Sequence, residues 1–132
     1  MATVLVADDE AANRALLTYL LHHAGHESLE AADGEAALRL ARERRPDVAI
    51  VDLNMPKTNG AALLKELRRD PDLRDLTIVL YTATGPSAAV RDFMQLFDVR
   101  HAIHKPCRPA QALEVIESAV AQAASSRKLR EH

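Results

Sequence analysis

Three apolar segments of this sequence each end on side chains that can bind a metal ion or a phosphate group. Asp8 and Asp9 follow the first segment, Asp52 follows the second, and Thr82 ends the third. In open α/β sheets, ligands bind beyond the carboxyl ends of the strands, so neighbouring strands would bring these groups into one pocket. A single aspartate at a strand end most often closes the strand or caps a turn, but here several polar groups share this position.

The grouping of carboxylates predicts a bound cation. Carboxylates that lie together repel and raise one another's pKa, so they need a positive charge between them. Mg²⁺ takes oxygen ligands and keeps several waters, which suits two carboxylates, a backbone carbonyl and an incoming phosphate oxygen. Lys105 supplies a point charge for a phosphoryl group, and the Thr82 hydroxyl can donate to a phosphoryl oxygen. Because a carboxylate can form an aspartyl phosphate, the pattern indicates a phosphoryl acceptor at Asp52.

The elements that position these groups alternate as strand and helix along the chain. Short apolar runs predict strands, and apolar residues spaced three and four apart predict helices. The strands are expected at Val4 to Ala7, His26 to Ala31, Val48 to Val51, Thr77 to Thr82, and His101 to His104. The helices are expected to begin near Ala11, Asp33, Asn59, Gly85 and Pro109.

Five strand and helix repeats predict an α/β fold, a doubly wound parallel sheet with helices on both faces. The second and fifth strands are short or polar, which favours edge positions and the strand order 2-1-3-4-5. This order places Asp8 and Asp9 beside Asp52. The expected apolar sets are Ala12, Ala15, Leu16, Tyr19 and Leu20 in the first helix, Val90, Phe93, Met94 and Phe97 in the fourth, and Leu113, Ile116 and Val120 in the last.

Composition limits the classes of protein that are compatible with the chain. Its 132 residues fit one domain, predicted over residues 1–124, with a mainly aliphatic core because only 3% of residues are aromatic. The tail, residues 125–132, has no apolar face and is expected to be flexible, as a linker or an expression remnant. The net charge of -2 argues against direct binding of nucleic acid. No apolar run approaches the ~20 residues of a membrane span, so a soluble cytoplasmic protein is expected.

Four segments together resemble the receiver domain of two-component response regulators, in particular the chemotaxis-regulator-like members. They are VLVADDE, IVDLNMPKTNG, IVLYTA and HKP, which occur in the family's order and spacing between about Thr3 and Ala123. The resemblance implies a flavodoxin-like fold and a Mg²⁺-dependent phosphoacceptor. It also implies a histidine kinase or histidine phosphotransfer protein as donor, a downstream protein or output domain as target, and a phosphorylation-dependent homodimer as an option.

The resemblance assigns a role to each residue of the pocket. Asp52 would be the phosphorylated residue, and Thr82 and Lys105 would bind the phosphoryl oxygens. The Lys105–Pro106 bond would be cis. The metal, Mg²⁺ or alternatively Mn²⁺, would be bound by Asp8, Asp9, Asp52 and the backbone carbonyl of Asn54.

The sequence departs from the family at one position and leaves two rival functions open. Receivers usually carry an aromatic residue three positions before the lysine, where this chain has Ala102, so the route from phosphate to output needs another explanation. A pseudo-receiver that only binds partners has little reason to keep the whole site. An aspartyl-phosphate hydrolase would need a second carboxylate where Asn54 stands, so an acceptor with some autodephosphorylation is favoured over a turnover enzyme.

Overall fold

The strands form a five-stranded parallel sheet in the order β2-β1-β3-β4-β5. The computed structural model describes residues 1–53, 55, 60–83, 85 and 87–131. The order predicted from strand composition is confirmed. The strands are β1 at Thr3–Ala7, β2 at Glu27–Ala31, β3 at Val48–Asp52, β4 at Thr77–Thr82 and β5 at His101–His104.

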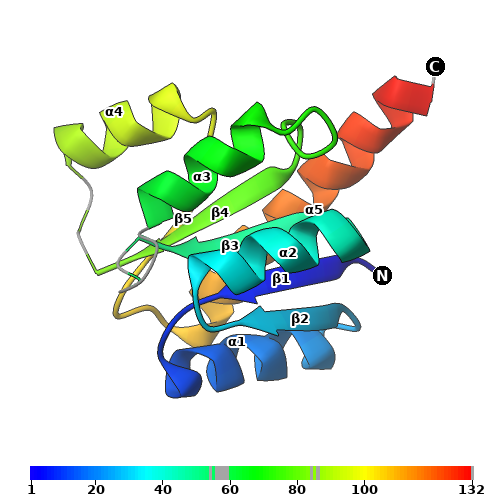
Figure 1. The fold of residues 1–132 in the computed structure, drawn as a ribbon. Coiled ribbons are helices and arrows are strands. Elements are labelled where there is room, and N and C mark those ends of the chain that lie inside the picture. The colour runs from blue at the N-terminus through cyan, green and yellow to red at the C-terminus, as the bar shows by residue number, and fades with distance from the viewer. Residues whose placement is uncertain (54, 56–59, 84, 86, 132) are drawn as a thin grey trace.

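Helices cover both faces of the sheet, as expected for right-handed crossovers between parallel strands (Figure 1). Alternation along the strands separates two buried clusters. One cluster joins the sheet to α1 and α5, and the other joins it to α2, α3 and α4. The helices are α1 at Ala11–His23, α2 at Gly34–Arg44, α3 at Gly60–Arg69, α4 at Ala88–Leu96 and α5 at Pro109–Glu131.

The central strands are buried along their whole length, which fixes the position of their carboxyl ends. Every residue of β3 and β4 is buried, including Asp52 and Thr82 at their ends. Such strands read as continuous apolar runs because helices pack on both sides of them. Asp33 caps α2 as predicted, since its carboxylate accepts the Ala36 N–H at 2.8 Å.

The buried face of α1 differs from the predicted one. Leu17, Leu20 and Leu21 are buried, whereas Leu16 and Tyr19 are 42% and 66% exposed. Both sets have helical spacing, so periodicity alone did not separate them. Leu20 belongs to the predicted set and is buried as expected. Leu17 and Leu21 are buried in place of Leu16 and Tyr19, because they pack in the cluster that joins the sheet to α1 and α5.

The ends of two helices also differ from the predictions. Ser87 is the N-cap of α4, accepting the Val90 N–H at 3.2 Å, so this helix begins later than Gly85. The last helix continues past Ala124 to Glu131, because the sequence beyond Ala124 contains neither glycine nor proline to stop it.

The predicted apolar faces of α4 and α5 are confirmed in part. Val90 is buried, and the aromatic and methionine side chains of α4 pack against the same cluster. In α5, Ile116 is buried as predicted and Val120 packs against the cluster while partly buried, whereas Leu113 is only half-buried and Ala112 and Ala119 are buried instead. The small alanines let the helix lie close to the sheet.

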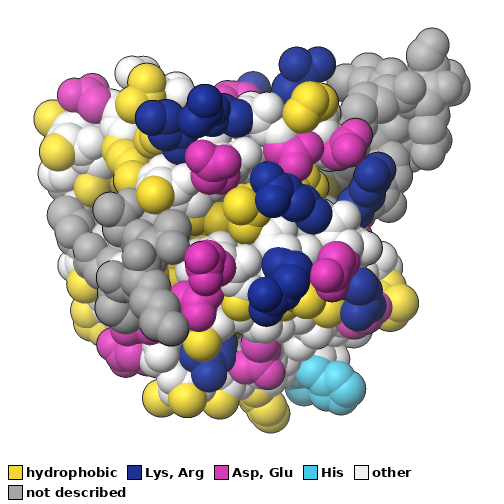
Figure 2. Space-filling model, viewed as in Figure 1, with side chains coloured by type: hydrophobic (Ala, Val, Ile, Leu, Met, Phe, Trp, Pro, Cys, Tyr) yellow, Lys and Arg dark blue, Asp and Glu magenta, His cyan; other side chains and the backbone are white. Residues whose placement is uncertain are grey.

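Charges of both signs are interspersed over the face that carries α2 and α3 (Figure 2). Two ion pairs tie α2 to the segment after α3, Arg42 with Asp70 at 3.1 Å and Arg45 with Asp72 at 3.4 Å. Pairs as exposed as these contribute little to stability. Among the described residues, no helix has the length and apolar character needed to cross a membrane.

Arg68, near the end of α3, joins two loops through its guanidinium group. It donates to the carbonyl oxygens of Phe97 at 2.7 Å, Leu76 at 2.7 Å, Arg74 at 2.8 Å and Asp98 at 3.2 Å. Burial lowers the pKa of this guanidinium below its ordinary value. The contacts satisfy carbonyls at the end of α4 and before β4, so Arg68 anchors the C-terminal end of α4 to α3.

Replacing Arg68 by lysine is expected to lower the free energy of unfolding by about 2 kcal/mol, since an ammonium cannot satisfy four carbonyls spread over two loops. Urea unfolding measures the effect. Arg69→Lys is the matched control, because the Arg69 side chain is 67% exposed and pairs at 3.6 Å with Glu66, which is also exposed. Equal losses in the two variants would show that the carbonyl contacts of Arg68 add no stability.

Candidate functional site

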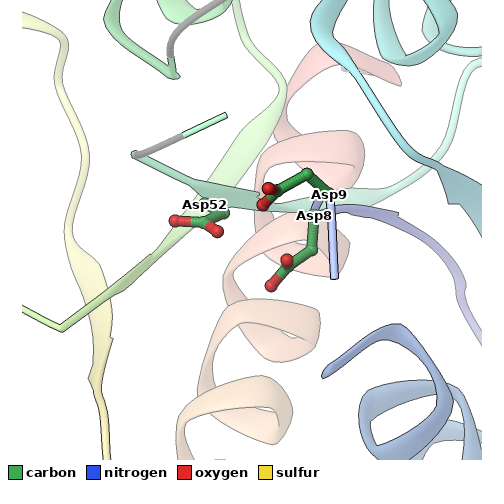
Figure 3. Close-up of side chains that lie close together, drawn as sticks. All are labelled: Asp8, Asp9 and Asp52. Atoms are coloured by element: carbon green, nitrogen blue, oxygen red, sulfur yellow. The ribbon is translucent and has the colours of Figure 1, made fainter. Parts of the chain in front are cut away.

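The carboxylates of Asp8, Asp9 and Asp52 meet at the carboxyl edge of the sheet (Figure 3). Ala7 pairs with Val51 in the β1–β3 ladder, so the residues that follow them are neighbours. One oxygen from each carboxylate lies within 4.8 Å of the other two. Asp8 and Asp52 are buried, whereas Asp9 is exposed. The predicted juxtaposition of these three residues is therefore present.

Asp8 is the most constrained of the three carboxylates. Its Oδ1 accepts the Glu10 N–H at 2.8 Å, and its backbone carbonyl accepts from Arg14 at 2.7 Å. Its Oδ2 is buried and has no hydrogen-bond partner within the described part of the chain. Burial, followed by repulsion from Asp52, raises the pKa of Asp8, although the Glu10 N–H and Lys105 oppose the shift.

Lys105 supplies the positive charge at this edge. Its Nζ lies 3.5 Å from Asp52 Oδ2 and 3.8 Å from Asp8 Oδ2. The backbone fixes where the side chain starts, because the Lys105 N–H donates to the Thr82 carbonyl at 2.7 Å and the bond to Pro106 is cis. The expected cis bond is thus present.

Thr82 ends β4 one residue beyond the pairing of Tyr81 with Asp52. Thr82 is fully buried, so its hydroxyl lies inside the protein at the carboxyl edge of the sheet. The sequence also predicted a metal ligand in the backbone carbonyl of Asn54, but this residue lies outside the described residues, as does the predicted cap at Asn59.

Gly60 begins α3 directly against the end of β3. Its N–H donates to the Leu53 carbonyl at 3.0 Å. A Cβ at this position would lie 2.6 Å from the Asp52 carbonyl oxygen and 2.6 Å from the Leu53 Cα, a distance that real Cβ atoms do not adopt. A glycine is therefore required for α3 to support the backbone that carries Asp52.

The donor set fits a hard divalent cation. Carboxylate oxygens are the ligands that Mg²⁺ prefers, and the buried Asp8 Oδ2 is an acceptor without a hydrogen bond in the described chain. The Lys105 ammonium contacts two of the three carboxylates, Asp8 and Asp52, and all three carboxylates lie close enough to share one ion. The acidic pocket is suited to a metal ion.

Tyr81 is a residue of this site to which sequence reasoning gave no role. Its ring lies beneath the Lys105 ammonium, with Nζ 4.3 Å from the ring centroid. Burial, with the negative charge of Asp8 next in importance, raises the pKa of the phenol, which keeps it neutral. Alternation places residues 81, 103 and 105 on one face only once the pairing of Tyr81 with Ile103 is known, so the strand pattern alone did not indicate the contact.

Comparison with known proteins agrees with this arrangement. Residues 4–117 match the response regulator receiver domain family. The fold matches chemotaxis protein CheY4 of Vibrio cholerae with a TM-score of 0.84 and 31% identity, covering 90% of this chain and 98% of that chain. This chain therefore belongs to the response regulator receiver domain family, a family of signalling modules rather than turnover enzymes.

Curated relatives point to the same family. The chain is 33% identical over 81 residues to the polar-differentiation response regulator DivK of Brucella anthropi, which covers 61% of this chain and 66% of DivK. It is 37% identical over 83 residues to the phosphate regulon transcriptional regulatory protein PhoB of Pseudomonas aeruginosa, covering 63% of this chain and 36% of PhoB. The match thus spans about a third of PhoB.

Asp8→Asn is expected to raise the free energy of unfolding of the metal-free protein by on the order of 1 kcal/mol, because it removes a buried charge that Asp52 repels. The raised pKa means that the folded chain binds this proton more tightly than the unfolded chain. The charged Asp8 carboxylate therefore destabilises the fold fully at a pH above the raised pKa. This destabilisation is absent at a pH below 3.8, the ordinary pKa.

Urea unfolding of both proteins at about pH 8 and at about pH 4, close to the ordinary pKa of 3.8, measures this difference, which should shrink at the lower pH. Millimolar Mg²⁺ should reduce or reverse the gain, because the cation stabilises the wild-type carboxylates. Asp9→Asn is the control and should gain less, since solvent screens an exposed charge. A variant less stable than wild type at the higher pH without Mg²⁺ would contradict the expected repulsion.

Proposed function

We propose that this chain is the phosphoacceptor of a phosphorelay and that Asp52 is the residue phosphorylated. The observation that supports the proposal best is the contact of Lys105 with Asp52 at 3.5 Å, beside the cluster of Asp8, Asp9 and Asp52. Acidic groups that bind a metal, next to a cation that can bind phosphate, form an environment for transfer of a phosphoryl group to a carboxylate. A purely structural module has no use for a buried pair of carboxylates beside a lysine at this edge.

In the proposed reaction an Asp52 carboxylate oxygen attacks the phosphorus of a phosphohistidine. The O–P bond of an acyl phosphate forms, the P–N bond breaks, and the donor imidazole takes the electron pair and leaves. Lys105 pairs with the phosphoryl oxygens, and the Thr82 hydroxyl donates to one of them. Autodephosphorylation, the attack of water on the same phosphorus, would return Asp52 to its starting state.

Mg²⁺, or Mn²⁺ in its place, would be held by Asp8, Asp9, Asp52 and the backbone carbonyl of Asn54. Bound there, the metal supplies positive charge to the transferred phosphoryl oxygens. The donor would be a cytoplasmic histidine kinase or histidine phosphotransfer protein, and the target a partner protein or an output domain. A homodimer that forms on phosphorylation is a further proposed state.

Phosphorylation would be transmitted mainly through the start of α4. Ala102 offers no ring to reorient, so the contacts that differ between the two states must lie elsewhere. Thr82 is joined by a short segment to Ser87, the N-cap of α4. Val90 is the buried residue of this helix, and Arg68 anchors its other end. The N-terminal end of α4 is therefore the end that can move.

Acetyl phosphate with Mg²⁺ is expected to add one phosphoryl group to the wild-type chain and none to Asp52→Asn, as measured by intact mass. The control is Asp92→Asn, which changes an exposed aspartate on α4 and should be labelled like wild type. Undiminished labelling of Asp52→Asn would rule out the assignment. Labelling of neither protein would rule out the phosphoacceptor function.

Beryllofluoride with Mg²⁺ is expected to shift amide NMR signals most in residues 83–92 and least in β5, because Ala102 cannot carry the change. Arg68→Lys should extend the shifts toward Phe97, since it loosens the anchored end of α4. Shifts centred on His101–His104 with residues 83–92 unchanged would show that the signal runs through β5 instead.

A further inference from the structure

The Lys105 ammonium lies over the face of a buried aromatic ring, a feature outside the proposed set of metal and phosphate ligands. Nζ is 4.3 Å from the centroid of Tyr81, within the ~6 Å over which a cation is attracted to the negative face of a ring. The same ammonium contacts Asp52 and Asp8. Lys105 therefore has a ring on one side and carboxylates on another.

The sheet holds the ring in this place. Tyr81 pairs with Asp52 on one side and with Ile103 on the other. Lys105 follows Ile103 by two residues and so starts from the same face of the sheet. The Tyr81 side chain packs in the cluster that joins the sheet to α1 and α5, and the residue is only 7% exposed. The ring cannot turn away without opening this cluster.

Lysine needs such support more than arginine would. Its ammonium sits on a flexible four-carbon stem, and it is strongly hydrated. The Lys105 side chain is 21% exposed, so water competes with the carboxylates for its protons. A ring face beneath Nζ attracts the charge and excludes water from that side, which limits the positions the ammonium can take.

We propose that Tyr81 is a positioning residue for phosphoryl binding, whose ring holds the Lys105 ammonium at the mouth of the Asp52 pocket, ready for the phosphoryl oxygens. This inference rests on the proposed phosphorylation of Asp52. A leucine would fill the apolar cluster about as well as the body of the tyrosine does, so the ring itself is what the site requires. The phenol oxygen has no part in the proposal.

The test measures the affinity of the chain for beryllofluoride in saturating Mg²⁺. Tyr81→Leu, which keeps an apolar side chain but removes the ring, is expected to weaken binding by roughly five- to thirtyfold. Tyr81→Phe keeps the ring and is expected to remain within about twofold of wild type. Tyr81→Met serves as a second ringless variant, and urea unfolding reports which variants fold.

A double-mutant cycle separates positioning from packing. In Lys105→Met there is no ammonium to hold, so adding Tyr81→Leu should cause no further loss of beryllofluoride affinity. Mg²⁺ affinity without beryllofluoride should be the same in wild type and Tyr81→Leu, because the ring acts on the Lys105 ammonium, which is not a proposed metal ligand.

The outcomes distinguish this inference from the proposed function. If wild type binds beryllofluoride and folded ringless variants bind it equally well, Tyr81 has no positioning role, while the phosphoacceptor function stands. Additive losses with Lys105→Met, or a parallel loss of Mg²⁺ affinity, would also overturn the inference, because they mark a general change in packing. If wild type fails to bind beryllofluoride in Mg²⁺, the proposed function fails and the inference fails with it.

Discussion

Repulsion among Asp8, Asp9 and Asp52 is the constraint around which this fold is built. Two of these carboxylates are buried, and burial raises the pKa of Asp8 above its ordinary value. Such a cluster destabilises the fold unless a counter-charge is present. A destabilising cluster of this kind indicates a functional site rather than a packing role. The parallel sheet tolerates this repulsion because its central strands are buried along their whole length, which stabilises the fold.

The supports of the site come from several parts of the chain. Gly60 lets α3 begin against the end of β3, at a distance that any side chain would prevent. Arg14 of α1 donates to the carbonyl of Asp8, and the Lys105 amide extends the β4–β5 ladder by one residue. Each contact fixes a backbone rather than a charged group. The functional side chains are thus placed by a rigid edge and remain able to exchange partners.

In contrast to the rigid edge of the sheet, α4 is held unevenly along its length. Val90 is its buried residue, and its C-terminal end is held by Arg68 through two carbonyls and by Phe93, Met94 and Phe97, which pack against the buried cluster. A helix with one anchored end and one lightly packed end can change its angle at small cost. In a receiver domain without the usual aromatic at position 102, this difference between the two ends of α4 offers a mechanical route from the phosphate to a partner.

The sequence alone determined the strand order and the cluster of Asp8, Asp9 and Asp52, because strand polarity and strand-end position are local properties that a parallel sheet converts directly into neighbours. Local patterns could not decide the rotation of α1, where Leu16 and Tyr19 compete with Leu17 and Leu21 at equivalent spacing, nor the end of the last helix. Only the tertiary structure revealed that Tyr81 lies under Lys105, since this contact depends on the register of two strands and on the packing that holds the ring.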